Sequence, residues 1–430
     1  MFTIFCRVFQ FIFNYGAMVL PWRKAIPVEG QGSINRIPGL LGQQKVKKPM
    51  IVTDMGLVRA GIAGRITGVL EREKIPFIMY SDVEPNPSVN TVNAIQKLYI
   101  SENCDGIIAL GGGSSMDAAK AAAARVVHPD KSVNQMGGLL KVLKKIPPFI
   151  AIPTTSGTGS ETTIAALITD TNTHHKYAIM DLSLIPRYAI LDPDLTTGLP
   201  PFISATTGMD ALTHAVEAYL CWTYNTAESI QFAIDAVKAI FENLEKVYSD
   251  GKNIEARQAM MIASYKAGFA FTRAGVGNIH AIAHTLGGLY NTAHGLANAV
   301  ILPVVLEDYG EKVHAKLARL AEAAGLVSAA DRQAGTGTDL QARNDAAVSV
   351  KTDAEKARLF IDAIYAMNER MNIPRYFDFI REDDIPLMIK WASAESNPLY
   401  PVPVVYSKKR FRSVIEKIRK PAQNETAGSN

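Results

Sequence analysis

The sequence predicts two parts of different fold class: an α/β domain with a parallel β-sheet, followed by an all-helical domain. In the first half, short apolar runs alternate with segments of helical periodicity, as expected when helices connect parallel strands. Several of these runs are apolar throughout, which is typical of strands buried on both faces. From residue 203 onwards strand-like runs almost disappear, while helical spacing continues.

The predicted strands begin and end near Pro, Asp or Gly, which commonly bound strands. They cover residues 49–54, 76–83, 105–114, 148–155, 176–181 and 188–195. Helices are expected between them at 57–73, 90–102 and 115–126. Pro200 and Pro201 close the strand region, so we predict an α/β domain over 1–198 and a helical domain over 199–430. The helices predicted in the second domain cover 204–221, 229–247, 254–271, 310–325, 353–372 and 408–419.

Composition narrows the class of protein. The chain has 430 residues, 48% hydrophobic and 20% charged, with a net charge of +4. Its Lys and Arg residues are scattered, so nucleic acid is not expected as a partner. Three widely spaced cysteines form no disulfide framework, and they fit a cytoplasmic protein in a reducing compartment.

The N-terminal 22 residues are apolar, but Arg7, Gln10 and Asn14 interrupt them. The remaining apolar runs are too short to span a bilayer, so no membrane partner is predicted. We expect an amphipathic element that packs on the body of the protein or on another subunit. Residues 327–352 are polar and rich in Gly, Ala, Asp and Thr, which predicts a long loop.

A glycine-rich turn follows the predicted strand at 105–114, in "ALGGGSSMDAAK". Gly111, Gly112 and Gly113 allow a sharp turn and a close approach of the backbone to an anion. Ser114 then begins a helix whose free N–H groups favour a phosphate, and Asp117 completes the pattern G-G-G-S-x-x-D. The pattern predicts a dinucleotide-binding turn, although a purely structural turn is the alternative.

A second polar turn, "PTTSGTGSE" at 153–161, also follows an apolar strand. It supplies the hydroxyls of Thr154, Thr155 and Thr158 at the carboxyl end of the sheet, where ligands bind in open α/β sheets. Asp54 ends an earlier strand, where a carboxylate would accept hydrogen bonds from a ribose and repel a 2′-phosphate. It favours NAD over NADP, unless Asp54 serves only as a helix N-cap.

The helical domain contains a group of residues with metal-ligand chemistry. Asp210 and His214 are four residues apart in a helical segment, as are His280 and His284, so each pair shares one helix face. His294 follows beyond a Gly-Gly pair at 287–288, where the helix is expected to end or bend. Imidazoles and a carboxylate in apolar surroundings suit a divalent transition metal. A site that activates a substrate keeps one position open, so not every histidine here needs to be a ligand.

Taken together, these motifs resemble those of the iron-containing (group III) alcohol dehydrogenases, from about residue 30 to about residue 420. "GGGSSMDAAK", "AIPTTSGTGSE", "GMDALTHAVEAY" and "HAIAHTLGGLYNTAHGLANA" follow each other in the family's order, and "NPLYPVP" at 397–403 resembles its C-terminal stretch. The apolar N-terminus and residues 327–352 depart from the family pattern.

The resemblance implies a Rossmann-like N-terminal domain, a helical metal-binding C-terminal domain and an active site in the cleft between them, an architecture similar to that of dehydroquinate synthase. It leaves His284 as the unligated, catalytic histidine. It implies that Asn86 and Lys176 lie along the cofactor or the cleft, and that Asp54 occupies a position associated with NAD preference. The metal ligands that it implies are Asp210, His214, His280 and His294.

The reaction implied is reversible hydride transfer between a small alcohol and NAD, with the aldehyde as product. The metal would act as a Lewis acid on the alcohol oxygen, and His284 would relay the proton. Fe²⁺ is the expected metal, with Zn²⁺ as a substitute because this set of donors binds Zn²⁺ more tightly. We expect a homodimer or a larger homo-oligomer.

Alternatives within the fold are a glycerol dehydrogenase-like enzyme and a hydroxyacid–oxoacid transhydrogenase. A dehydroquinate synthase is less well supported, because residues 203–299 contain few Lys and Arg to hold its charged substrate. The non-enzymatic alternative is a nucleotide-binding protein with an inactive metal site.

Overall fold

The computed structural model describes residues 1–170, 176–328 and 351–421. By internal contacts the chain divides into two compact units. The first, here called the sheet unit, comprises Phe13–Tyr219 and Tyr224–Gly275. The second, the helical unit, comprises Met1–Ile12, Leu220–Thr223 and Val276–Asn430. The predicted boundary at 198/199 was drawn where strands give way to helices, whereas these units are defined by contacts. The predicted domain boundary therefore stays a prediction.

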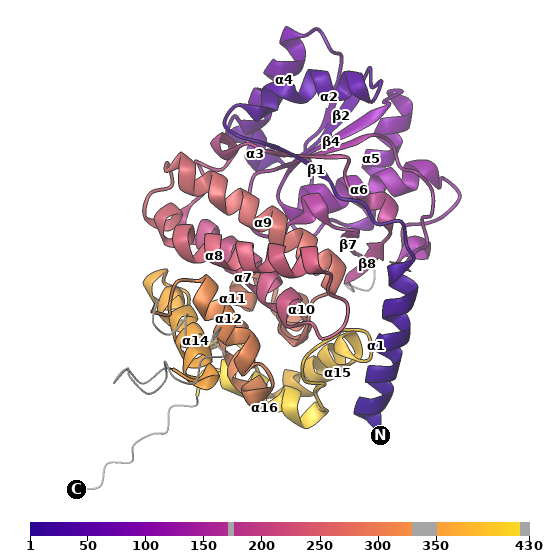
Figure 1. Ribbon diagram of the computed structural model, residues 1–430. Helices are drawn as coiled ribbons and strands as arrows, with labels where there is room; N and C mark the ends of the chain where they lie inside the picture. Colours follow the sequence, from indigo (N-terminus) through magenta and orange to yellow (C-terminus); the bar gives the residue numbers. More distant parts are fainter. Residues whose placement is uncertain (171–175, 329–350, 422–430) are drawn as a thin grey trace, which may run out of the picture. The chain divides into compact units, whose positions relative to one another are not determined.

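A parallel sheet forms the centre of the sheet unit (Figure 1). The inner strands are buried along their whole length, which explains their continuous apolar sequences. All pairings in this sheet are parallel. In spatial order the strands are β1 (Ile26–Glu29), β9 (Tyr188–Leu191), β6 (Phe149–Pro153), β4 (Gly106–Gly111), β2 (Pro49–Val52) and β3 (Ile78–Tyr80).

Helices cover both faces of this sheet, and a separate apolar core fills each side. On one side α2 (Ile37–Gln43) and α4 (Ile62–Arg72) contribute Ile37, Leu41, Ile66 and Leu70. On the other side lie α5 (Val89–Ser101) and α6 (Gly113–Val127), whose run of buried alanines allows close packing on the strands. The prediction of a doubly covered parallel sheet is therefore confirmed.

A second, smaller sheet has the order β5 (Gly138–Leu139), β8 (Lys176–Met180) and β7 (Ala165–Thr169). β7 and β8 pair antiparallel. The strand predicted at 176–181 therefore belongs to this sheet and not to the main one. β1, β5 and β7 were not predicted, because they are short and only partly buried.

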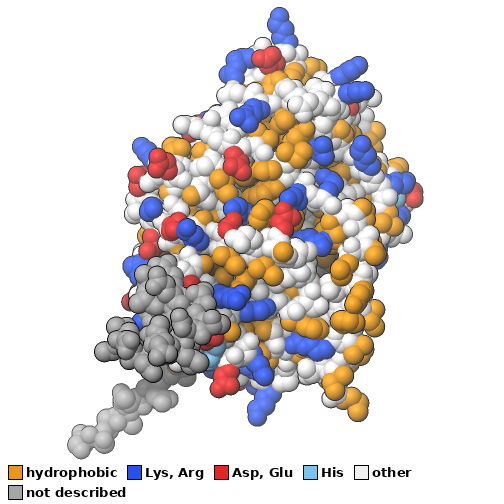
Figure 2. Space-filling view, viewed as in Figure 1, with side chains coloured by type: hydrophobic (Ala, Val, Ile, Leu, Met, Phe, Trp, Pro, Cys, Tyr) orange, Lys and Arg blue, Asp and Glu red, His pale blue; other side chains and the backbone are white. Residues whose placement is uncertain are grey.

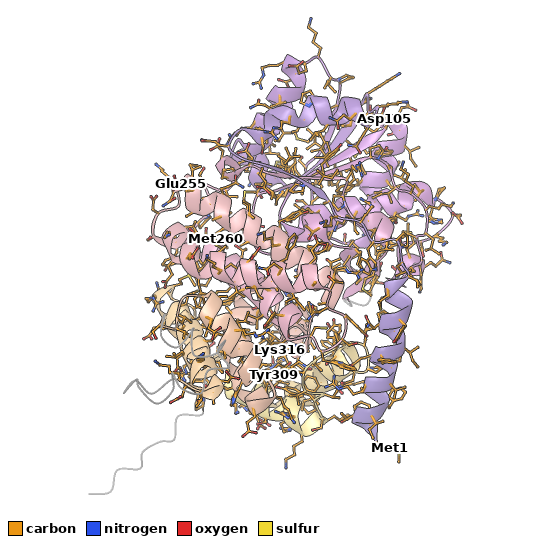
Figure 3. The ribbon with its side chains drawn as sticks, viewed as in Figure 1. Met1, Asp105, Glu255, Met260, Tyr309 and Lys316 are labelled. Carbon is orange, nitrogen blue, oxygen red and sulfur yellow. The ribbon has the colours of Figure 1, made fainter. Side chains whose placement is uncertain are left out.

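Three long helices complete the sheet unit: α7 (Pro201–Leu220), α8 (Ala227–Ser249) and α9 (Ile254–Ala274). Thr226 and Ser229 form a capping box at the start of α8, and the Asn253 side chain caps α9. α8 and α9 pack against each other. Figure 3 labels Glu255 in the first turn of α9 and Met260 further along it. The helices predicted at 204–221, 229–247 and 254–271 correspond to these three.

The described part of the helical unit consists mainly of packed helices (Figure 1). α10 packs against α11 and α15, and α12 packs against α14. Lys316, labelled in Figure 3, donates hydrogen bonds to the carbonyls of Leu220 (3.2 Å) and Cys221 (2.9 Å). The helices are α10 (Asn278–Tyr290), α11 (His294–Tyr309), α12 (His314–Ala323), α14 (Asp353–Arg370), α15 (Ile385–Ser396) and α16 (Lys408–Ile418).

The apolar N-terminus is a helix, α1 (Phe2–Met18). Two residues that interrupt its apolar pattern bind the segment 398–403. Arg7 donates to the carbonyls of Val402 (2.7 Å) and Pro403 (2.8 Å), and Gln10 donates to that of Pro398 (2.9 Å). The prediction that this element packs on the body is confirmed. Many other side chains of α1 are exposed and apolar, and Figure 2 shows hydrophobic side chains along the edge where Figure 1 draws α1.

In the described residues, no helix has the length and apolar character needed to cross a bilayer. The predicted helix at 57–73 is divided into α3 (Met55–Arg59) and α4, because Gly61 adopts a left-handed conformation with φ 75°. The loop predicted at 327–352 falls mainly on 329–350, outside the described residues.

Candidate functional site

The glycine-rich turn leads from β4 directly into α6. Gly111 has φ 146°, and a Cβ there would lie 2.5 Å from Ser115 Oγ, so only glycine fits this position. Gly112 is the N-cap of α6 and offers no side chain to the first turn. The free N–H groups of that turn are the kind of site that binds a phosphate.

The two polar turns are in contact, as expected for the carboxyl ends of neighbouring parallel strands. β4 and β6 are paired, and Thr154 N donates to the Gly111 carbonyl at 3.1 Å. A Cβ on Gly112 would lie 3.4 Å from Thr155 Oγ1, and one on Gly113 would lie 3.1 Å from Thr158 Cγ2. The structure therefore brings the predicted glycines and threonines together at one edge of the sheet.

Asp54 caps a helix and also lies beside this edge. Its carboxylate accepts a hydrogen bond from Leu57 N at 3.0 Å, and Ser115 Oγ lies 3.5 Å from its other oxygen. The backbone N–H of Asn86, in the left-handed region with φ 57°, donates to Ser114 Oγ at 3.4 Å. Asp54, Asn86 and Ser114 thus surround the start of α6, and their binding of a cofactor stays a prediction.

The Asp117 side chain points into the protein interior and away from the glycine-rich turn. Its carboxylate accepts hydrogen bonds from Ser160 Oγ (2.8 Å) and Leu167 N (3.1 Å). Burial raises the pKa of Asp117 to about 6, and the Lys120 ammonium opposes this effect. These contacts hold the polar turn that follows β6 against α6. Asp117 therefore supports that turn from the protein interior. Lys176 begins β8, but its side chain lies outside the described residues.

The α7 helix presents Asp210 and His214 one turn apart, and both are almost fully buried. The ring of His214 stacks on that of Phe271, with 4.1 Å between centroids. This contact limits the orientations that the imidazole can adopt. The i,i+4 spacing seen in the sequence therefore places a carboxylate and an oriented imidazole on one helix face.

The other histidines come from two adjoining helices. His280 and His284 lie on α10, which continues past Gly287 and Gly288 to Tyr290, so of the two alternatives predicted for these glycines the helix does not end there. His294 is the first residue of α11. Asn298 Nδ2 lies 3.1 Å from Nε2 of His280 and 3.2 Å from Nε2 of His294. Asn298 therefore bridges these two imidazoles and restrains the orientation of both rings.

Asp210, His214, His280 and His294 form one group in which each residue offers a ligand atom and all these atoms lie within 4.8 Å of one another. Donor atoms that bind one ion at about 2.1 Å are at most about 4.2 Å apart, so this spacing is close to what a single divalent ion requires. One carboxylate and three neutral imidazoles are also the donors that Fe²⁺ and Zn²⁺ accept.

His284 lies beside this group but has a different partner. Its ring stacks on that of His294 with 5.2 Å between centroids, and its Nδ1 lies 2.6 Å from Glu395 Oε1. The Tyr400 hydroxyl donates to the same oxygen at 2.7 Å. Burial acts to raise the pKa of Glu395, but His284 and the hydrogen bonds outweigh it, so this pKa is lower than usual and Glu395 is ionised.

Sequence reasoning missed Glu395, Tyr400 and Asn298. Glu395 lies two residues before the motif at 397–403 that the family resemblance had already marked, and Tyr400 lies within it, which was the one available signal. Asn298 lies four residues after His294, the same helical spacing that marked the histidine pair.

Comparisons with known proteins identify the family to which this chain is similar. Residues 27–193 match the profile of the family described as iron-containing alcohol dehydrogenase, and residues 204–418 match the C-terminal profile of the same family. NAD-dependent methanol dehydrogenase of Bacillus methanolicus is 35% identical over 86% of this chain and 93% of its own. Alcohol dehydrogenase 4 of Saccharomyces cerevisiae is 33% identical over 90% of this chain and 95% of its own.

The solved structure of a 1,3-propanediol oxidoreductase is similar to almost the whole of this chain. It superimposes with a TM-score of 0.84 at 30% identity, covering 93% of this chain and all of the other. The two profiles together span most of the chain, with a gap between 193 and 204. From its sequence motifs, its fold and these matches, the chain belongs to the iron-containing alcohol dehydrogenase family.

Proposed function

We propose that the protein catalyses the reversible oxidation of a small primary alcohol or diol to the corresponding aldehyde, with NAD as the hydride acceptor. The observation that carries this proposal is the group of one carboxylate and three imidazoles whose ligand atoms lie within 4.8 Å of one another. The names of the relatives support NAD as cofactor and short alcohols or diols as the substrate class.

When bound, Fe²⁺ supplies Lewis acidity toward the alcohol oxygen, and NAD supplies the hydride acceptor. Asp210, His214, His280 and His294 would hold the ion. Their burial, with His294 partly exposed, keeps bulk water from competing for most of the donor atoms.

Binding of NAD is assigned to the two polar turns, which follow β4 and β6. The free N–H groups at the start of α6 bind the pyrophosphate, and the hydroxyls of Thr154, Thr155 and Thr158 complete the site. Asp54 accepts hydrogen bonds from the ribose hydroxyls and disfavours the 2′-phosphate of NADP. The NAD preference follows from this carboxylate.

His284 is assigned the proton transfer. Oxidation of an alcohol releases the hydroxyl proton, and reduction of an aldehyde requires one at the same oxygen. His284 lies beside His294 and is partly exposed, so it can exchange a proton with the reacting oxygen and then with solvent.

The test uses protein purified without oxygen, freed of metal and reloaded with Fe²⁺. Alcohols and diols of increasing length are oxidised with NAD⁺ and with NADP⁺, and formation of the reduced cofactor is followed by absorbance. We expect turnover that depends on Fe²⁺ and prefers NAD⁺, with weaker or no turnover after loading with Zn²⁺. No reduced cofactor with any alcohol, diol or glycerol would contradict the proposal.

The same assay addresses the alternatives. Preference for glycerol would identify a glycerol dehydrogenase-like enzyme. Exchange between a hydroxyacid and an oxoacid without added NAD⁺ would identify a transhydrogenase that retains its cofactor.

We also propose a cytoplasmic homo-oligomer. The three cysteines are described in the structure, are buried and form no disulfide, which fits a reducing compartment. Among the exposed apolar side chains of α1 are Phe2, Phe5 and Ile12, and contact with a second copy would remove them from water. Light scattering of the purified protein measures the oligomeric state, and a strictly monomeric mass would contradict that part.

A further inference from the structure

The short contact between His284 and Glu395 fixes which ring nitrogen carries the proton. Nδ1 lies 2.6 Å from Oε1, a short contact that identifies the two atoms as hydrogen-bond partners. An ionised carboxylate can only accept, so Nδ1 is the donor. In the neutral imidazole the lone pair then resides on Nε2, and Nε2 is the nitrogen that can accept a proton.

The position of Glu395 is set by the packing of two helices. α15 packs against α10, and the contact is anchored near both ends. Ser396 Oγ donates to Asn278 Oδ1 at 2.7 Å, and both residues are fully buried. Towards the other end, a Cβ on Gly288 would lie 3.3 Å from the Trp391 ring. These anchors fix the register of α15 along α10, so that Glu395 is opposite His284.

Tyr400 is a second hydrogen-bond partner of the Glu395 carboxylate. Its hydroxyl donates to Glu395 Oε1 at 2.7 Å, and its backbone N–H donates to the Ser396 carbonyl at 2.8 Å. The same oxygen therefore accepts from both Tyr400 and His284. A carboxylate restrained in this way orients an imidazole more firmly than a carboxylate free to rotate.

The ring oriented by this pair lies among the predicted metal ligands. It stacks on His294, with an interplanar angle of 18°, and its centroid is 6.0 Å from that of His280. A rotation of the ring, or the opposite tautomer, would move the proton-accepting nitrogen away from the reacting oxygen. A small change in orientation at this position therefore has a direct chemical consequence.

We propose that Glu395 is the positioning residue for His284, holding the imidazole with Nδ1 protonated so that Nε2 exchanges the proton of the substrate alcohol, while Tyr400 restrains the carboxylate. The proposal rests on the proposed function, in which His284 carries that proton. It assigns Glu395 a role through His284 and no contact with substrate or metal.

The test compares Glu395→Gln with the unchanged protein. The amide has the same shape but is uncharged, and it can present either an oxygen or an NH₂ group to Nδ1. We expect kcat to fall by about 10- to 100-fold, the cost typical of removing an orienting partner of an active-site histidine. Iron content and the KM for NAD⁺ should stay at the values of the unchanged protein, because Glu395 touches neither.

A second readout does not depend on the reaction. In protein loaded with diamagnetic Zn²⁺ and labelled with ¹⁵N in its histidines, nitrogen chemical shifts distinguish the two tautomers of His284. The unchanged protein should show the proton on Nδ1, and the Glu395→Gln protein should show the other tautomer or a mixture. This readout still reports on Glu395 if the unchanged protein oxidises no alcohol, so the two proposals can fail separately.

Tyr400→Phe serves as a second variant, and it keeps the proposal testable if Glu395→Gln does not fold. It should lower kcat by a smaller factor than Glu395→Gln and leave iron content unchanged. Tyr290→Phe is the matched control, because Tyr290 on α10 donates to a different carboxylate, Asp384, at 2.6 Å. Its kcat should match that of the unchanged protein.

Three outcomes would overturn the proposal. The first is an unchanged kcat in Glu395→Gln, and the second is a lower kcat with the proton still on Nδ1 of His284. The third is loss of iron from Glu395→Gln, because the carboxylate would then act on the metal site and not on the tautomer.

Discussion

Lys120 is fully buried beneath the glycine-rich turn, and replacing it with methionine should strongly destabilise the protein. Its ammonium donates to the carbonyls of Ser160 (2.6 Å), Thr163 (2.9 Å) and Ala165 (3.1 Å), and to the Thr163 hydroxyl (2.8 Å). These contacts join α6 to the segment that follows β6. Burial lowers the pKa of Lys120 to about 8, opposed by Asp117 and Glu161, so it remains mainly charged at neutral pH.

The expected cost follows from the groups left behind in Lys120→Met. Methionine keeps the apolar stem, so little packing is lost. Two buried carbonyls and one partly buried carbonyl lose a donor, and each buried unsatisfied polar group costs about 1–3 kcal/mol. Asp117 loses its neighbouring cation, and breaking a buried pair by removing one partner costs about 3–5 kcal/mol. Because these effects overlap and the segment can relax, we expect a total loss of about 3–5 kcal/mol.

The assay is unfolding by denaturant, with NAD⁺ binding measured on the folded protein. Lys97→Met is the matched control, because Lys97 on α5 is exposed and the same chemical change there should alter stability by at most about 0.5 kcal/mol. We expect weaker NAD⁺ binding in Lys120→Met, since the network supports the turn. A loss of stability below about 1 kcal/mol would refute the view that Lys120 holds this edge of the sheet together.

Three further predictions concern metal, cofactor and pH. His280→Ala should lower Fe²⁺ affinity by roughly 100-fold or more while preserving NAD⁺ affinity, and normal iron content after dialysis would contradict the ligand assignment. Asp54→Gly should raise the NADP⁺-to-NAD⁺ ratio of kcat/KM by about tenfold, or ~1.4 kcal/mol. Glycine is an acceptable N-cap, and the substitution removes the negative charge. An unchanged ratio would show that Asp54 does not set the cofactor preference. Burial raises the pKa of Glu161 to about 7 from an ordinary 4.5, so the folded state binds the proton more tightly and loses stability as pH rises through that window. Denaturation at a series of pH values should show Glu161→Gln gaining stability relative to the unchanged protein between about pH 5 and 8, and parallel curves would contradict this.

The parts of the fold that sequence could predict are those with a local signature. The inner strands β2, β4, β6 and β9 are buried on both faces, which forces continuous apolar runs. β7 alternates between buried and partly or fully exposed positions over five residues, a pattern too short to distinguish from a loop. The break between α3 and α4 depends on one left-handed residue, Gly61, in a segment otherwise periodic throughout.

The same division applies to the site. The spacings of Asp210 with His214 and of His280 with His284 are local, and they predict convergence because helix geometry is regular. The inward orientation of Asp117 depends on Leu167, fifty residues further along the chain. The pairing of Glu395 with His284 likewise depends on how α15 packs on α10, which no local pattern encodes.

The central claim is that one divalent ion is bound by three imidazoles and one carboxylate. X-ray absorption at the iron edge of Fe²⁺-loaded protein measures this directly, because imidazole ligands give characteristic multiple scattering. We expect about three imidazole nitrogens and at least one oxygen at roughly 2.0–2.2 Å from the iron. A first shell of oxygens alone, without scattering from imidazole, would contradict the account.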